Sequence, residues 1–351
     1  MLRALGGSLL AGVVLACSVT SASAAPVVDG KSGHCSDARP ARAVSARKPW
    51  CSLDRALEAA NGTVLVRAGT YAPLKINGFH GRIAFRAWPR ERPTLRWIDA
   101  TDSSGFSFQG FRFTGEADMT NVSGFSFTDN LSTFKPNGGQ TLSGYVVTGA
   151  SRGTWQGNTV SGGWIGVHFR WGGAKDITIA GNRFRDLGGQ GVHLQDGSGV
   201  LIARNRFEDI VPRRNIDPAA HADAVQCLGP SRDVVFDGNR VTGGRGFLVM
   251  FAPTDDALPA GQTGMVIRNN VFTGRDFGIR VFSAPGIRIL DNRVWGSSGG
   301  PHSGIDLQAA VGGNLETLDA VLRGNVVKRL DVARSVSYTG LQNRIVHAAR
   351  W

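Results

Sequence analysis

The segment Trp155-Gln156-Gly157-Asn158-Thr159-Val160 recurs in altered form through the middle of the chain. Each copy has an asparagine, often after a glycine, followed by a short apolar stretch. The asparagines are Asn158, Asn182, Asn205, Asn239, Asn270, Asn292 and Asn325, and the steps between them are 24, 23, 34, 31, 22 and 33 residues. A period of this length predicts stacked supersecondary units, each of which buries its apolar face against its neighbours.

Short segments with apolar residues at alternate positions extend from residue 64 to about residue 346. Examples are Ile83–Arg86, Gly105–Gln109, Gly124–Thr128, Gly144–Thr148 and Asp176–Ala180. Sandwiches and barrels also contain many short strands, but they do not repeat one phrase at a nearly constant step. The pattern therefore predicts a coil of parallel strands. Ser52 is expected to cap a short helix that precedes it, from Leu53 to Ala60.

The repeated asparagines are predicted to be structural. A buried asparagine at the same corner of successive turns can bond to the copies above and below it. Alternatively, these asparagines mark turns and nothing more. We expect no catalysis from them in either case.

The chain resembles the right-handed parallel β-helix superfamily, which includes pectate-lyase-like proteins, over about residues 50–346. The resemblance rests on the asparagine phrases and on Lys48–Leu53 with Thr63–Tyr71, which look like the capping helix and first strand of many secreted members. It implies an all-β fold, a single-stranded right-handed parallel β-helix with a short N-terminal capping helix. The superfamily includes polysaccharide lyases, glycoside hydrolases, epimerases, adhesins and tailspikes, so the fold does not choose the function.

The expected organisation is a signal peptide at 1–24, an N-terminal coil at 25–51, the β-helix at 52–346 and a tail at 347–351. The first 24 residues combine Arg3, an apolar core and the small residues Ala22-Ser23-Ala24, which is typical of a secretion signal. We therefore expect a secreted or periplasmic protein, with a lipoprotein anchored through Cys17 as a minor alternative. No other stretch approaches the ~20 apolar residues of a membrane span.

An exported chain meets an oxidising compartment, so Cys35 and Cys51 are predicted to form a disulfide. Cys227 lies in an apolar run and is expected to be a small buried residue.

The formal net charge is +12, from 39 Lys and Arg against 27 Asp and Glu. This excess favours polyanions, and the expected partner is an acidic polysaccharide. The alternative is a surface that is merely rich in arginine. Nucleic acid is not expected, because the chain has an export signal and no alternation of aromatic and basic residues. We expect a monomer.

A second family of strands precedes the asparagine phrases and includes Gly166–Arg170 and Gly191–Gln195. Each of these strands has an apolar residue after a glycine or alanine. The residues that follow the apolar one form a column of His168, His193, Gln226, Leu248, Arg280 and Asp306. A second column adds Arg170, Gln195 and Gln308. Because side chains alternate across a strand, both columns should face outward. Because successive turns lie about 4.8 Å apart, this strip would offer regularly spaced contacts to a linear sugar chain.

The two longest steps imply insertions of roughly 10 residues at Val211–Ala220 and Ala252–Gly261, and such loops usually form cleft walls. The first insertion leads into His221-Ala222-Asp223-Ala224-Val225-Gln226. His221 can move a proton while Asp223 sets its tautomer and raises its basicity. The alternative is a structural His–Asp pair that closes the loop.

Eliminative cleavage of a uronic-acid polymer needs neutralisation of the substrate carboxylate, a base for the C5 proton and an acid for the leaving oxygen. Histidine is favoured over arginine as the base, because an arginine base would need a strongly lowered pKa. The candidate catalytic residues are His221, Asp223, His193 and Arg280. The candidate substrate-binding residues are Gln226, Gln195, His168, Arg170, Arg245, Arg213, Asp306 and Gln308.

Three other activities remain open. Hydrolysis needs two carboxylates that face the glycosidic bond, and the clustered aspartates of polygalacturonase-like hydrolases are not evident. A C5-epimerase shares most requirements of a lyase, and a binding or structural coil needs no catalytic group. No cofactor is expected, with Ca²⁺ as the alternative. A zinc site is not expected, because paired Cys/His spacing is absent from the sequence.

Overall fold

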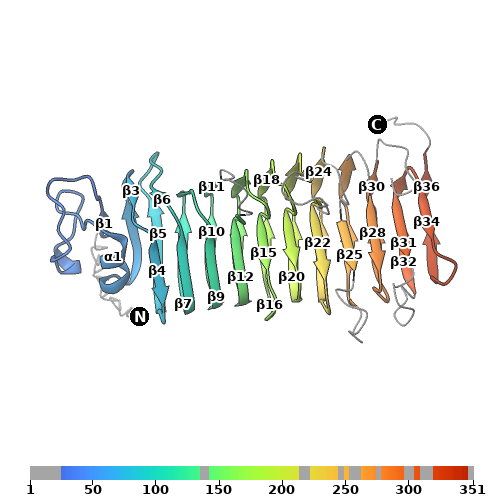
Figure 1. Cartoon of the computed structure of the whole chain (residues 1–351), viewed down its shortest axis with the longest axis horizontal. Coiled ribbons are helices and arrows are strands. Elements are labelled where there is room, and N and C mark those ends of the chain that lie inside the picture. The colour runs from blue at the N-terminus through green and yellow to red at the C-terminus, as the bar shows by residue number, and fades with distance from the viewer. Residues whose placement is uncertain are drawn as a thin grey trace, which may run out of the picture.

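The computed structural model describes residues 25–134, 142–212, 222–243, 249–252, 262–273, 278–295, 304–308 and 319–346. Its strands stand side by side along one long axis, in sequence order from the N-terminal to the C-terminal end (Figure 1). Every pairing between the strands described below is parallel. Each turn of the coil places one strand in each of three rows, which we call rows 1, 2 and 3.

Row 1 contains β4 (Leu74–Asn77), β7 (Ile98–Gln109), β9 (Ala117–Ser123), β12 (Tyr145–Ser151), β15 (Val167–Phe169), β19 (Val192–Leu194), β22 (Val225–Leu228), β25 (Val249–Ala252), β28 (Ile279–Phe282), β31 (Ile305–Gln308) and β34 (Leu330–Val332). Row 2 contains β1 (Val27–Val28), β2 (Gly62–Val66), β5 (His80–Ala87), the second half of β7, β10 (Ser126–Thr128), β13 (Thr154–Gln156), β17 (Thr178–Ala180), β20 (Gly197–Ala203), β23 (Arg232–Asp237), β26 (Val266–Arg268), β29 (Arg288–Leu290), β32 (Ala320–Arg323) and β35 (Tyr338–Leu341). Long strands such as β7, together with the corner strand β16 (Ala174–Lys175), join rows 1 and 2 into one sheet.

Row 3 is a separate sheet of 12 strands. It contains β3 (Thr70–Tyr71), β6 (Thr94–Leu95), β8 (Arg112–Phe113), β11 (Leu131–Thr133), β14 (Thr159–Ser161), β18 (Arg183–Arg185), β21 (Arg206–Glu208), β24 (Arg240–Thr242), β27 (Val271–Thr273), β30 (Arg293–Val294), β33 (Val326–Val327) and β36 (Arg344–Ile345). The strand segments predicted from alternating apolar residues all lie within or overlap these strands.

The N-terminal end of the coil is covered by α1 (Leu53–Ala59), as predicted (Figure 1). The Oγ atom of Ser52 accepts a hydrogen bond from the backbone N–H of Arg55 at 3.2 Å, which confirms the expected cap. The segment 25–51 is not coil throughout, because it contains β1 and the short 3-10 helix η1 (Ala41–Ala43). The predicted disulfide between Cys35 and Cys51 is present.

The interior is filled by the apolar residues that alternate with outward positions. In row 2, Phe85, Phe108, Phe127 and Trp155 occupy the same position on successive strands and stack at centroid distances of 5.2, 5.7 and 5.9 Å. Each turn thus buries large rings mainly against the turns on either side. Cys227 is buried as well, as expected.

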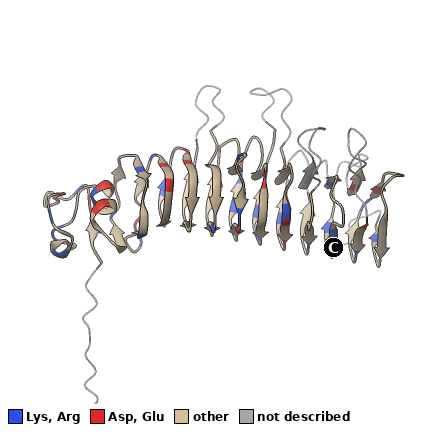
Figure 2. Cartoon of the chain, turned by 90° about the horizontal axis from the view of Figure 1, so that it is seen from below, with Lys and Arg blue, Asp and Glu red and all other residues tan. Residues whose placement is uncertain are grey.

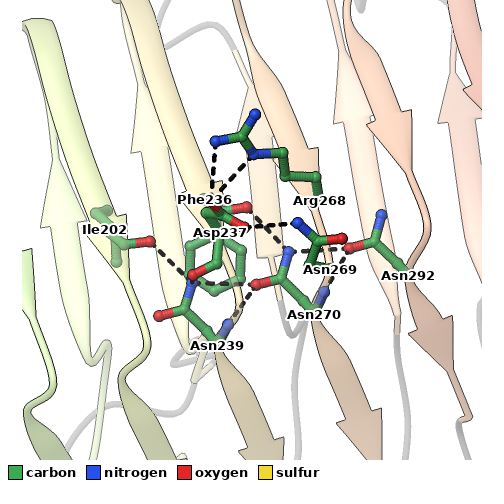
Figure 3. Close-up of polar contacts among 8 residues, drawn as sticks. All are labelled: Ile202, Phe236, Asp237, Asn239, Arg268, Asn269, Asn270 and Asn292. Atoms are coloured by element: carbon green, nitrogen blue, oxygen red, sulfur yellow. Dashed lines mark hydrogen bonds and ion pairs between the residues drawn. The ribbon is translucent and has the colours of Figure 1, made fainter.

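The repeated asparagines form a continuous hydrogen-bonded ladder, and Figure 3 shows three of its members. The side-chain N–H of Asn239 donates to Oδ1 of Asn270 at 3.1 Å and to the carbonyl oxygen of Ile202 at 2.8 Å. Oδ1 of Asn239 accepts from the backbone and side-chain N–H groups of Asn205. The ladder extends one turn beyond the seven asparagines of the sequence pattern at each end, to Asn130 and Asn343. Because the ladder residues from Asn130 to Asn325 are at most 2% exposed, they stabilise the corner and do not meet a ligand.

The residue before each ladder asparagine has a left-handed backbone conformation, for example φ +67° at Gly157 and φ +65° at Gly181. Glycine, asparagine and aspartate adopt this conformation at low cost, which explains their frequency in the repeated phrase. Arg204, with φ +53°, is an exception that the backbone tolerates at some cost in strain.

Candidate functional site

The predicted polar column exists on the outer face of row 1. His168 on β15, His193 on β19 and Gln226 on β22 are directly opposite one another on three consecutive turns. Arg280 on β28 and Asp306 on β31 are paired in the same way. The apolar neighbours Val167, Val192, Val225, Ile279 and Ile305 are buried in the core, so the alternation places the polar column outside, as predicted.

One member of the predicted column is wrong. Met250, not Leu248, stands opposite Gln226 and Arg280. The stretch from Phe247 to Phe251 is apolar throughout. It therefore fits the alternating pattern equally well with Leu248 or with Met250 in the column. The hydrogen bonds between turns select the frame in which β25 begins at Val249.

The column is less open to solvent than alternation alone suggests. His168 and His193 are half-buried, but Gln226 is 5% exposed and Asp306 only 1%. Both ring nitrogens of His193 and Nε2 of His168 are themselves buried, so the exposed area of the two histidines lies elsewhere on these residues.

The rings of His168 and His193 stack in parallel, with centroids 4.7 Å apart and planes 4° from parallel. Burial, and secondarily the positive charge of Arg170, lowers the pKa of His168 to about 4. The imidazole of His168 is therefore neutral at pH 5 and above. Because His168 is neutral, the ring of His193 is not stacked against a positive charge.

The lowered pKa of His168 predicts a loss of stability in acid. The unfolded chain binds a proton on this residue below about pH 6.5, whereas the folded chain does so only near pH 4. The stabilisation is complete above pH 6.5 and is lost as the pH falls toward 4, by about 1–2 kcal/mol after allowance for partial exposure. Urea unfolding at pH 7 and pH 4.5 should show a smaller pH difference in His168→Gln than in wild type. The exposed His34, changed to Gln, is the control, and an unchanged pH difference in His168→Gln would contradict the prediction.

Arg280 is held by the protein itself. Its Nε lies 3.2 Å from Oδ2 of the buried Asp306, and its guanidinium lies over the ring of Phe282 at 5.0 Å. The side-chain N–H of Gln308 donates to Oδ1 of the same carboxylate. These contacts fix a positive charge at the C-terminal part of the column.

The remaining predicted residues do not all join the column. Arg170 follows β15 and is exposed, and Gln195 follows β19 and is half-buried, so both lie beside the two histidines. Asp223 precedes β22 and is fully buried. The other predicted residues, His221, Arg213 and Arg245, lie outside the described part of the chain, as does most of each predicted insertion.

A cavity adjoins the column on its N-terminal side, and the sequence reasoning missed it. Continuing from His168, the same outward position holds Val146, then Asp118 and Asp99. The cavity has a volume of about 840 Å³ and is lined by Arg96, Trp97, Ile98, Asp99, Arg112, Thr114, Gly115, Glu116, Asp118, Thr133 and Leu142. The signal was available in Ile98-Asp99-Ala100 and Ala117-Asp118-Met119, which repeat the apolar–polar–apolar pattern of the later strands.

Glu116 is the chemically distinctive residue of this cavity. Burial raises the pKa of its carboxyl, and the charge of Asp118 adds to the shift. The backbone N–H of Ser143 donates to its Oε2 at 2.9 Å, which opposes the shift. Arg170 lowers the pKa electrostatically, so the cavity and the histidine pair lie within range of each other's charges.

Within the described segments, no group of three or more His, Cys, Asp or Glu residues is arranged to hold a metal ion. Nor does that part of the chain contain a helix long and apolar enough to cross a membrane.

The family model described as "Right handed beta helix region" matches residues 98–251. Together with the parallel rows, this match shows that the chain has the right-handed parallel β-helix fold. The expected fold class is thus confirmed. No curated protein matches the sequence.

Three solved structures illustrate the range of similar proteins. A GH136 lacto-N-biosidase from Eubacterium ramulus has a TM-score of 0.61 and 11% identity, over 92% of this chain and 68% of that one. The surface adhesin PfbA of Streptococcus pneumoniae has a TM-score of 0.53 and 15% identity, over 73% of each chain. Pectate lyase Pel9A has a TM-score of 0.51 and 15% identity, over 91% of this chain and 78% of that one. At such identities the likeness concerns the fold, and the function has to be argued from this chain's own residues.

Proposed function

We propose that this protein is secreted and acts on an acidic polysaccharide, which it cleaves by β-elimination. The observation that carries the proposal is the register of His168, His193 and Gln226 on three consecutive turns of the outer wall. Turns about 4.8 Å apart allow side chains of one column to contact successive parts of a linear sugar chain. Two similar structures, a lacto-N-biosidase and a pectate lyase, are named as enzymes that act on saccharides.

The reaction assigns a role to each side chain beside the stacked rings. In β-elimination the C5–H bond of a uronate breaks, its electrons form a C4=C5 double bond, and the C4–O bond breaks as the leaving oxygen gains a proton from a water molecule. The exposed guanidinium of Arg170 can pair with the substrate carboxylate and so make the C5 proton more acidic. We assign His193 the role of the general base that removes that proton, for which substrate binding has to uncover one of its two buried ring nitrogens. We assign Gln226 a hydrogen bond to the sugar chain through the 5% of its surface that is exposed.

Arg280 has a binding role in this proposal. Arginine side chains keep their charge in proteins, and the ion pair with Asp306 holds this guanidinium in place. Asp306 and Gln308 act through Arg280 by holding it in place. The buried Asp223 is a candidate partner for His221, which was the other predicted base.

Product analysis tests the reaction. The protein should release a product that absorbs ultraviolet light from at least one of pectate, alginate and glucuronan, because elimination creates a C4=C5 double bond conjugated with the carboxylate. Activity should fall as salt screens the attraction between Arg170 and the polymer. New reducing ends without this absorbance would contradict elimination.

A glycoside hydrolase is the second candidate, and the cavity favours it. The raised pKa of Glu116 suits a general acid, and Asp118 supplies a second carboxylate in the same cavity. A half-buried Trp97 in the lining can stack on a sugar ring. The hydrolase predicts new reducing ends without ultraviolet absorbance, and their loss in Glu116→Gln but not in His193→Ala.

A further inference from the structure

Arginines stand one above another on the outer face of row 3. Arg183, Arg206 and Arg240 occupy the same position on β18, β21 and β24, and all three are exposed. Val271 takes this position on the next turn, and Arg293 on the turn after that. We call these four arginines the arginine column. Figure 2 shows blue segments side by side on neighbouring strands in the middle of the coil.

Within the described segments of the chain, only the first member of the column has an acidic partner. Nε and an Nη atom of Arg183 lie 2.7 and 2.6 Å from Oε2 of Glu208. Among the residues that the structure describes, the side chains of Arg206, Arg240 and Arg293 form no ion pair or hydrogen bond. Like charges directly opposite each other on neighbouring strands repel, so the column opposes the stacking of its own turns. An anion that bridged the guanidinium groups would remove this repulsion.

The positions around the column indicate which kind of anion fits. The other outward residues from β14 to β27 are Thr159, Ser161, Arg185, Glu208, Thr242, Val271 and Thr273, without an aromatic residue. Single-stranded nucleic acid is bound largely by stacking of successive bases on aromatic rings. The outward positions of β18, β21 and β24 carry no aromatic residue, and Trp295, two residues after Arg293, lies at the C-terminal end of the column with Nζ of Lys328 5.7 Å from its ring. Guanidinium groups with nearby hydroxyls suit a polymer that repeats carboxylates and sugar hydroxyls along its length.

We propose that the arginine column is a second, non-catalytic binding surface for an acidic polysaccharide, a polymer class that rests on the proposed function. Row 3 is a sheet of its own, distinct from the row that carries the histidine pair. A polymer held on row 3 stays near the protein between encounters with row 1, which raises its effective concentration there. Short oligosaccharides cannot span both surfaces and gain nothing from the column.

Binding to polygalacturonate, measured without turnover, tests the proposal. The double variant Arg206→Gln/Arg240→Gln should bind the polymer about tenfold or more weakly, with a shallower salt dependence, because two charge-assisted contacts are lost. The matched control is Arg42→Gln/Arg47→Gln, which removes the same charge from exposed positions of the N-terminal segment and should bind like wild type. If short oligosaccharides are cleaved, their turnover should be equal in wild type and in both double variants.

Three results would overturn the proposal. They are wild-type affinity in the Arg206/Arg240 double variant, an equal loss in the Arg42/Arg47 control, and equally tight wild-type binding of single-stranded DNA. The last would make the column a general polyanion surface. Failure of the proposed elimination reaction is a separate result. In that case the ultraviolet absorbance is missing, but the polymer still binds and its binding still depends on Arg206 and Arg240.

Discussion

Replacing His193 by alanine should reduce kcat for the acidic polysaccharide by about 10²–10⁴-fold, the usual contribution of a positioned general base. KM should change little, because Arg170 and Gln226 remain to hold the polymer. The measurement is the initial rate of ultraviolet absorbance increase on the best polymer of the panel. Added imidazole should restore part of the rate, since a small base can occupy the space left by the ring.

The matched variant is His168→Phe, which keeps a flat ring against His193 but has no proton to exchange. Because His168 is assigned the role of a neutral neighbour, His168→Phe should retain most of the activity. Thermal unfolding of both variants checks that the coil is intact. Full activity in a folded His193→Ala protein would remove His193 as the base, and loss of activity in His221→Ala alone would transfer the role to His221.

Replacing Asn239 by alanine should lower the free energy of unfolding by about 3 kcal/mol, because several buried groups lose their partners at once. The carbonyl oxygen of Ile202 and Oδ1 of Asn270 lose a donor, and the two N–H groups of Asn205 lose an acceptor. Asn239 itself is 1% exposed, so bulk water does not replace these bonds. Urea unfolding followed by tryptophan fluorescence measures the change.

Asn269→Gly is the control for Asn239→Ala and alters the residue next to a ladder member (Figure 3). The side chain of Asn269 is exposed and donates to Oδ1 of Asp237 at 3.0 Å. Its φ of +56° suits glycine, so the stability should stay within about 0.5 kcal/mol of wild type. If both variants unfold like wild type, the ladder does not stabilise the coil as argued.

The site could be predicted in part. Alternation along a strand was enough to place His168, His193 and Gln226 on one face, because a side chain's face depends only on its position in its own strand. The frame of β25 was not predictable, since an unbroken apolar run fits the pattern at Leu248 and at Met250 alike. The burial of Gln226 and Asp306 also depends on neighbours that are distant in the sequence.

The sequence by itself determined the parallel coil, the structural role of the repeated asparagines, the capping helix and the disulfide. The coil and the asparagines repeat with a period, the helix depends on adjacent residues, and the disulfide was expected because the export signal implies an oxidising compartment. The tertiary structure alone decided that the rings of His168 and His193 stack, that Arg280 is held by Asp306, and that Glu116 and Asp118 line a cavity beside them. Such contacts arise when hydrogen bonds between turns bring together residues more than twenty positions apart, and their strength depends on how completely the neighbouring turns exclude water.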